Sequence, residues 1–233
     1  MRTIDLFATP IFLFDMSEKP EKEKLKKLAI DYKKKSKESK KQNNKNSFKS
    51  DYIDDKKMVT KFYESISREI KYVNNQMGLL NYNPEMSSPW FNVSLKGEFH
   101  ERHIHQGTDF NAIYFLDVPK QKEPLKLIFE NPDYISTFKK NEPQMYSKYN
   151  STMTTIPVKS DLMVIFESHI VCATMQNQSK SPVITLNFNI NHHLAEENIW
   201  HFSKNLYNGI IQTYKYYCSE WGLYLWVEYL YMG

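Results

Sequence analysis

Residues 99–116 read FHERHIHQGTDFNAIYFL and hold three of the chain's seven histidines. Two of them, His103 and His105, are separated by one residue. In an extended chain the side chains at positions i and i+2 point to the same side, so these two imidazoles are expected to lie together. The apolar run AIYFL that follows is typical of a buried strand. The stretch therefore predicts a strand that begins beside half of a metal site, or beside an ordinary solvated histidine pair.

The composition is that of a globular protein: the chain has 233 residues, of which 41% are hydrophobic and 15% aromatic. That length suffices for one well-buried domain. No run of about 18 apolar residues occurs, which excludes a typical membrane helix. The N-terminal segment contains Asp5 and no small-residue cleavage pattern, so a signal peptide is not expected. The two cysteines, Cys172 and Cys218, cannot build a disulfide framework, and we expect a cytoplasmic protein.

A lysine-rich segment precedes the histidine stretch. Residues 19–57 contain 15 Lys and 7 acidic residues, which is a net charge of +8 against +4 for the whole chain. Segments of this kind can bind nucleic acid or an anionic membrane. Here the lysines alternate with Glu, Asn and Ser, and Arg is absent from the segment. The pattern favours a solvated helix and loop, so neither nucleic acid nor a membrane is expected as a partner.

Two helices are predicted before the histidine stretch. The spacing of apolar residues predicts amphipathic helices over 21–37 and 57–75. Residues 3–14 predict an opening pair of strands, and the polar, low-complexity stretch 36–50 predicts a loop.

Short strands follow Pro89 and are bounded by Gly, Pro, Asn or Asp. Their sequences are WFNVSL, HIH…AIYFLDV, LKLIFE, TMTTIPV, LMVIF and VITLNFNI. Short strands preceded by helices predict an α+β protein whose β part is a sandwich or a barrel. After Asn191 the pattern changes again. Residues 195–217 are compatible with a helix, and the chain ends in the aromatic run WGLYLWVEYLYMG.

The order of these strands and side chains resembles a group of small Fe(II)/2-oxoglutarate-dependent oxygenases that are common in phages and marine bacteria. The resemblance covers residues 3–15 and 88–191, and it rests on LFATPIF, WFNVSLKGEFHERHIH, AIYFLDVP, LIFENP, IPVKSDLMVIFES and ITLNFNI. It implies a double-stranded β-helix, which is a jelly-roll, cupin-like barrel with its metal at one mouth.

The resemblance also implies a domain organisation. Residues 1–194 are expected to form a single oxygenase-like domain, with a helical insert at 19–83 that packs on the barrel core 88–191. Residues 195–233 are expected to form a helical, aromatic-rich extension.

The resemblance implies that His103 and His105 are iron ligands, because they match the family's H-x-H motif. Such sites hold Fe(II) with two His and usually a carboxylate, and leave positions open for the keto acid and O2. At the position of the family's more distant His this chain has Cys172. A thiolate with two imidazoles is a plausible ligand set for zinc or iron, whereas a buried Cys can also simply pack in the barrel. His169 is the alternative ligand.

The same resemblance implies a cosubstrate site. Asn92 and Tyr114 match polar residues of the family's strands, and Thr185 and Asn187 share the inward face of the last strand with Val183. Family members have an Arg at the position of Val183, where it pairs with the distal carboxylate of 2-oxoglutarate. If a cation replaces it, Lys159, Lys180 or Arg102 would have to supply the charge.

We therefore expect a non-haem Fe(II)/2-oxoglutarate-dependent oxygenase, a dioxygenase-type oxidoreductase with a small-molecule or peptide substrate and no catalytic residue beyond the metal ligands. If the chain is phage-encoded, it would act in the host-cell cytoplasm. Cys172 and Val183 favour an alternative, a degenerate and non-catalytic jelly-roll module for binding or structure. A third hypothesis is self-association as a homodimer through the aromatic tail, residues 221–232. Three further histidines, His100, His192 and His193, are expected at solvated positions.

Overall fold

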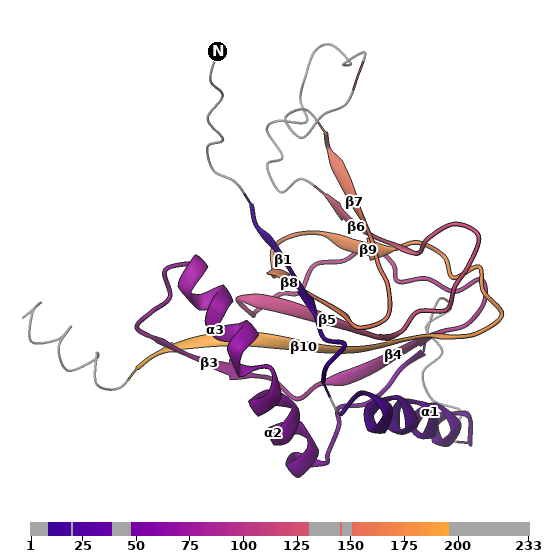
Figure 1. Cartoon of the computed structure of the whole chain (residues 1–233), viewed down its shortest axis with the longest axis horizontal. Coiled ribbons are helices and arrows are strands. Elements are labelled where there is room, and N and C mark those ends of the chain that lie inside the picture. Colours follow the sequence, from indigo (N-terminus) through magenta and orange to yellow (C-terminus); the bar gives the residue numbers. More distant parts are fainter. Residues whose placement is uncertain (1–8, 20, 39–47, 131–144, 146–150, 196–233) are drawn as a thin grey trace, which may run out of the picture. The chain divides into compact units, whose positions relative to one another are not determined.

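The computed structural model describes residues 9–19, 21–38, 48–130, 145 and 151–195 (Figure 1). Its helices are α1 (Lys22–Glu38), α2 (Lys56–Ser65) and α3 (Ser67–Gln76). Its strands are β1 (Ile11–Asp15), β2 (Phe48–Lys49), β3 (Tyr82–Met86), β4 (Trp90–Ser94), β5 (Phe110–Asp117), β6 (Lys126–Glu130), β7 (Met153–Pro157), β8 (Leu162–Glu167), β9 (Cys172–Thr174) and β10 (Val183–Leu194).

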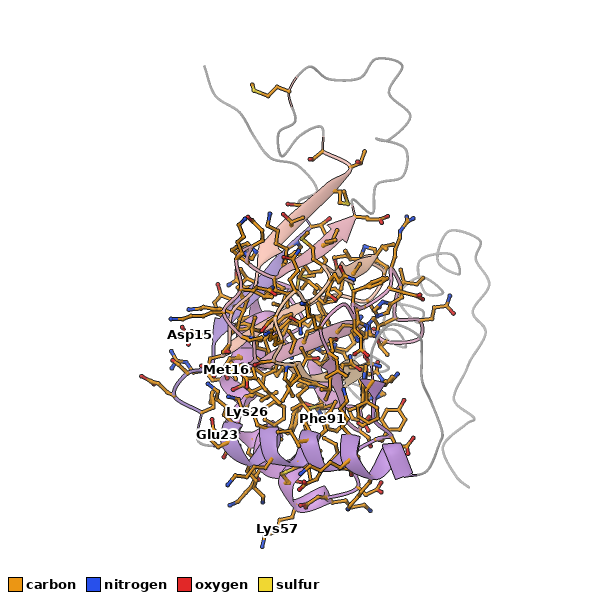
Figure 2. The ribbon with its side chains drawn as sticks, turned by 90° about the vertical axis from the view of Figure 1, so that its right-hand side faces the viewer. Asp15, Met16, Glu23, Lys26, Lys57 and Phe91 are labelled. Carbon is orange, nitrogen blue, oxygen red and sulfur yellow. The ribbon has the colours of Figure 1, made fainter. Side chains whose placement is uncertain are left out.

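The described strands form two sheets. The larger sheet has seven strands in the order β1-β8-β5-β10-β4-β2, with β3 paired to β10 off this path. Successive strands along the path are antiparallel. The smaller sheet has the order β7-β6-β9 and is also antiparallel. Figures 1 and 2 show the smaller sheet on one side of the larger sheet and the helices on the other. The mainly antiparallel β architecture expected from the sequence is confirmed.

The space between the two sheets holds an apolar core. In β5 the residues Ile113 and Phe115 belong to this core, as do Leu127 and Phe129 of the smaller sheet. Phe129 packs edge-on against Phe166 of β8, with ring centroids 4.9 Å apart. Alternation along each strand selects these residues, because successive side chains point to opposite faces of a sheet.

The opposite face of the larger sheet packs against the helices. Phe62 of α2 stacks on Tyr114 of β5, with ring centroids 6.1 Å apart and planes within 5° of parallel. Tyr32 of α1 packs against Phe91 of β4, whose position beside α1 is visible in Figure 2. The larger sheet is therefore buried on both faces, which accounts for the almost continuous apolar sequence of β5 and β8.

The helix predicted over 57–75 is two helices in the structure, and the break falls at Ile66. That residue has φ −105° and ψ 6°, outside helical geometry. On either side of it a serine hydroxyl donates to a backbone carbonyl: Ser65 Oγ to Phe62 O at 2.7 Å, and Ser67 Oγ to Glu64 O at 2.9 Å. Such bonds compete with the helical ladder and bend it, which explains the division.

The strands predicted after Pro89 are present, except that residues 103–105 of the predicted strand HIH…AIYFLDV lie before β5 and form only an isolated bridge at His103. Three short strands were not predicted. Strands β2, β3 and β9 have two to five residues and too little alternation to produce a sequence signal. Of the predicted opening pair 3–14, the structure describes β1, which pairs with β8. Within the predicted loop 36–50, residues 39–47 lie outside the described residues.

The chain divides into two compact units, and the first comprises residues 1–78 and 84–192. The residues that form the core between the two sheets belong to this unit, and so does the candidate site described below. The second unit comprises residues 79–83 and 193–233, and within it the Ala195 N–H donates to Asn81 O at 3.0 Å. Apart from Ala195, the predicted extension 195–233 lies outside the described residues, and so does its aromatic tail. None of the described helices has the length and apolarity needed to cross a membrane.

Candidate metal centre

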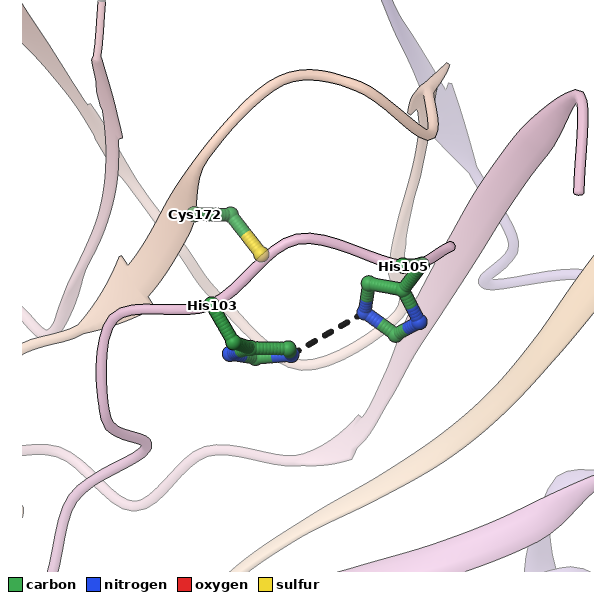
Figure 3. A group of neighbouring side chains, drawn as sticks. All are labelled: His103, His105 and Cys172. Atoms are coloured by element: carbon green, nitrogen blue, oxygen red, sulfur yellow. Dashed lines mark hydrogen bonds between the residues drawn. The ribbon is translucent and has the colours of Figure 1, made fainter. Parts of the chain in front are cut away.

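The histidine stretch passes beside the start of β9, and the two meet at a single bridge. His103 N–H donates to Cys172 O at 3.1 Å, and Cys172 N–H donates to His103 O at 3.0 Å. Residues in such a pair carry their side chains on the same face of the ladder. The backbone therefore holds the Cys172 thiol beside the His103 ring, as Figure 3 shows.

His105 completes the group. Its N–H donates to Ser168 O at 3.2 Å, and its Nε2 lies 3.0 Å from His103 Nε2. The ring centroids are 4.7 Å apart, so the prediction that the two imidazoles lie together is confirmed. His103 Nδ1 lies 2.7 Å from Glu101 O, and since a carbonyl can only accept, Nδ1 carries the proton. Its Nε2 is then the ring atom directed toward the group.

The ligating atoms of His103, His105 and Cys172 all lie within 4.8 Å of one another (Figure 3). Cys172 is buried, and both histidines are half-buried. His169, the alternative ligand, is exposed in the turn before β9 and is not part of this group.

Burial decides the protonation of the group. It raises the pKa of the Cys172 thiol to about 12. Burial also lowers the pKa of His105 to about 4, and the nearby charges of His103 and Lys49 add to that effect. Without a metal, Cys172 is therefore a neutral thiol and His105 a neutral imidazole near pH 7.

A cavity of about 240 Å³ extends from the group into the space between the sheets. Three of the residues expected at a cosubstrate site, Asn92, Thr185 and Asn187, line it, and Val183 lines it as well. Asn187 Nδ2 donates to Thr185 Oγ1 at 3.0 Å, which leaves the Thr185 hydroxyl proton available to an acceptor. Much of the remaining wall is apolar and belongs to the inter-sheet core: Ile113, Phe115, Leu125 and Leu127.

Tyr114, also expected at the cosubstrate site, lies elsewhere. It alternates with Ile113 and Phe115 along β5, so it points to the helix-facing side and stacks on Phe62. It is not among the residues that line the cavity. The two-residue period of the strand excludes it from the site, because its two neighbours already face inward.

Among the cavity residues that were not predicted are Lys49, Trp90 and His100. Lys49 Nζ lies 4.6 Å from the centre of the Trp90 ring, which in turn stacks on His105 with centroids 6.2 Å apart. Lys49 lies on strand β2, which has only two residues and is too short to show strand alternation in this polar segment. Trp90 opens a predicted strand, but its inward direction could only have been guessed from the alternation.

His100, expected at a solvated position, is instead largely enclosed. Its ring centroid lies 5.7 Å from that of His103, and its buried Nε2 has no hydrogen-bond partner among the described residues. Burial lowers its pKa to about 4. His100 therefore presents a neutral imidazole to the cavity.

His192 was also expected at a solvated strand end, and this was wrong, because its side chain is 4% exposed. Its Nδ1 lies 3.1 Å from Asp109 Oδ2, and its Nε2 lies 2.9 Å from Asn74 Oδ1. Both neighbours are acceptors, so the ring links α3 to the segment before β5. Its neighbour His193 is exposed, as expected.

The three cations named as replacements for the family's Arg do not line the cavity. Arg102 forms an ion pair with Glu130, Lys159 lies 3.4 Å from Asp15, and Lys180 is exposed. Among the described residues, Lys49 is the cation of the cavity wall, and Glu98 is its acid.

Comparisons with known proteins agree with this geometry. Residues 88–189 match the family model described as "Putative 2OG-Fe(II) oxygenase". A sequence search of curated proteins finds no match. The family expected from the sequence is thus the one whose model matches the barrel segment.

Solved structures with a similar fold include two prolyl hydroxylases. One is a Pseudomonas putida prolyl-4-hydroxylase, with 11% identity and a TM-score of 0.53 over 78% of this chain and 92% of that chain. Another is a prolyl hydroxylase from Trichoplax adhaerens, with 9% identity and a TM-score of 0.54 over 78% and 83%. HygX from Streptomyces hygroscopicus, solved with nickel and 2-oxoglutarate, has 8% identity and a TM-score of 0.50 over 78% and 82%. At these identities the likeness shows the fold, and it confirms the expected jelly-roll.

Proposed function

We propose that this chain is a non-haem Fe(II)/2-oxoglutarate-dependent oxygenase whose metal is held by His103, His105 and Cys172. The observation that carries the proposal is the convergence of these three donor atoms, within 4.8 Å of one another, at a cavity between the sheets. The match of residues 88–189 to the oxygenase family model supports the same reading.

The donor set fits a single metal ion. Imidazole nitrogens bind transition metals at about 2.1 Å and thiolate sulfur at about 2.3 Å. Two nitrogens at about 2.1 Å that subtend a right angle at one ion are about 3.0 Å apart. The observed separation of the His103 and His105 Nε2 atoms is 3.0 Å. Two imidazoles and one thiolate on one side of an ion would leave further positions open for a cosubstrate.

Each ligand has a defined part. His103 and His105 bind as neutral imidazoles, and the bond from His103 Nδ1 to Glu101 O keeps the Nε2 lone pair toward the ion. Cys172 would bind as a thiolate and would supply the single negative charge that a carboxylate supplies in most such sites. Because its thiol is buried, it loses its proton only when the ion binds.

When bound, iron and 2-oxoglutarate supply the oxidising chemistry that activates O2 for reaction at a C–H bond of the substrate. The chain's own residues bind, orient and exclude water. Asn92, Thr185 and Asn187 offer polar atoms to the cosubstrate from β4 and β10. The apolar wall formed by Ile113, Phe115 and Leu127 keeps the inner part of the cavity dry, which strengthens the polar contacts made inside it. The substrate is a small molecule or a peptide.

Anaerobic Fe(II) titration tests the proposal. Metal-free protein is loaded with Fe(II) and then given 2-oxoglutarate, and the visible charge-transfer band of a chelated keto acid is followed. We expect the band in the unmodified chain and its loss in His103→Ala and His105→Ala. Binding of iron with no band at any 2-oxoglutarate concentration would rule out the oxygenase assignment.

One observation favours a second candidate, a non-catalytic metal-binding jelly-roll. The family's Arg position is Val183, which lines the cavity and cannot pair with a carboxylate. If that loss has no replacement, the barrel would bind metal and no keto acid. The same titration separates the two candidates, since only the oxygenase produces the band.

A further inference from the structure

The cavity lacks a cation on the strand where one is expected. Val183 occupies the inward position of β10 that would carry it, and it is 5% exposed. The next two inward residues, Thr185 and Asn187, are neutral. A dicarboxylate in this cavity would need its charge balanced by a residue from another element.

Lys49 lies in the same sheet and at nearly the same depth. In the register of the sheet Lys49 is opposite Asn92 of β4, and Asn92 is opposite Thr185 of β10. Directly opposed residues point to the same face, and Asn92 and Thr185 both line the cavity. Lys49 therefore points into the cavity from two strands away, one inward position from the level of Val183.

Two neighbours equip this row to hold a carboxylate. Asn92 is 4% exposed, and its Oδ1 has no hydrogen-bond partner among the described residues. It is available to accept one N–H bond from the Lys49 ammonium, which would leave the other two for a ligand. Thr185 already accepts from Asn187 Nδ2, so its own hydroxyl proton is free to donate to an anion.

Trp90 contacts both the Lys49 ammonium and the metal group. The Lys49 ammonium lies over the indole ring at 4.6 Å from its centre, a cation–π contact, and the same ring also packs against His105 and Tyr52. No ion pair occupies Lys49 among the described residues. Glu98, the acid of the cavity wall, has its Oε2 2.6 Å from Leu95 N and accepts from it. The ammonium is therefore available to a ligand.

We infer that Lys49 is the binding residue for the distal carboxylate of 2-oxoglutarate, with Thr185 as a second donor. This inference rests on the proposed function. The positive charge then comes from the two-residue strand β2, which lies between α1 and α2 in the sequence and precedes the barrel core. It replaces the charge that the family's Arg supplies at the position of Val183. The site would then be electrically neutral. A divalent ion with one thiolate and one dicarboxylate has a net charge of −1, and the Lys49 ammonium balances it.

The experiment compares two keto acids on the anaerobic Fe(II)-loaded full chain by equilibrium dialysis. 2-Oxoglutarate has the distal carboxylate, whereas 2-oxopentanoate has the same carbon chain and the same chelating end without it. We expect Lys49→Met to weaken 2-oxoglutarate binding by about tenfold to a hundredfold, as for loss of a charge-assisted hydrogen bond. Binding of 2-oxopentanoate should change less than about twofold, because the variant leaves the chelating end untouched.

Two further variants sharpen the result. Lys49→Arg keeps the charge and should keep the preference for 2-oxoglutarate. Lys96→Met makes the same change of charge at an exposed residue outside the cavity wall, and should bind both keto acids like the unmodified chain. Since Lys49 is exposed as a residue, Lys49→Met should fold normally, and its melting temperature checks this.

The outcomes are distinct. Unchanged 2-oxoglutarate binding in Lys49→Met overturns the inference and leaves the oxygenase proposal standing. Equal affinity of the unmodified chain for both keto acids also overturns it, because no distal site would then exist. Binding of Fe(II) with neither keto acid overturns the proposed function and the inference together.

Discussion

His103 and Cys172 face each other across a single antiparallel bridge, with reciprocal N–H to carbonyl bonds of 3.1 and 3.0 Å. The bridge links the segment before β5 to the first residue of β9. Because backbone hydrogen bonds hold both residues, the thiol and the imidazole stay adjacent without a metal. A preformed donor set lowers the ordering cost of binding an ion.

Metal binding should release the proton of Cys172. Its pKa is raised to about 12, so the metal-free chain carries this proton throughout the neutral range, and the metal-bound thiolate does not. The logarithm of the metal association constant should therefore rise by about one per pH unit between about pH 7.5 and 9. His105, with a pKa lowered to about 4, contributes no proton in that window.

Competition of Co(II) or Zn(II) against a chelator of known affinity measures this slope. Cys172→Ala should bind more weakly and should lose the pH dependence. An equally steep slope in Cys172→Ala would show that another group releases the proton.

We expect the more distant ligand to be Cys172 and not His169. His169→Ala should keep the metal affinity within about twofold, because the residue is exposed and outside the donor group. Cys172→Ala should lose at least about tenfold, comparable to the loss of other groups that support a metal site. Isothermal titration of both variants with Zn(II) compares them directly. A larger loss in His169→Ala would transfer the ligand role to that residue.

The hydroxyl of Tyr114 should be dispensable. It is buried on the helix-facing side of β5 and has no hydrogen-bond partner among the described residues. Removing an unsatisfied hydroxyl removes a desolvation cost, so Tyr114→Phe should raise the free energy of unfolding by up to about 1 kcal/mol, or leave it unchanged.

Urea denaturation measures this change, and dialysis of 2-oxoglutarate measures cosubstrate binding in the same variant. Both should resemble or exceed the unmodified chain. A fall in cosubstrate affinity would place the Tyr114 hydroxyl in the site after all.

His192 should contribute to stability by joining α3 to the barrel. His192→Ala leaves Asn74 Oδ1, which accepts at 2.9 Å, without this partner in a residue that is 7% exposed. The expected loss is about 1–3 kcal/mol, or a fall in melting temperature of about 2–4 °C for each kcal/mol. The exposed His169→Ala is the control and should stay within about 0.5 kcal/mol of the unmodified chain. Equal melting temperatures for the two variants would show that the His192 contacts add nothing.

Local patterns in the sequence predict the strands and the direction of many side chains. The two-residue period places Val183, Thr185 and Asn187 on one face, and all three line the cavity. It also predicts the meeting of His103 and His105. These successes share a cause, because strand alternation is a property of the backbone and needs no knowledge of the neighbouring strand.

The same two-residue period could have excluded Tyr114 from the cosubstrate site. Its neighbours Ile113 and Phe115 are apolar and face the core between the sheets, so Tyr114 must face the other side. The split at Ile66 was less accessible, because apolar spacing continues through it and the serine hydroxyls that bend the helix act on the backbone alone.

By itself, then, the sequence determined the longer strands, most of their inward-facing residues and the closeness of His103 and His105. Only the tertiary structure decided that Cys172 lies beside His103, that His192 is enclosed, and that Lys49 reaches the cavity across β4. Each of these depends on which distant segments become neighbours in a sheet. That choice follows from burial of the whole core, so it leaves no mark in the few residues around any one position.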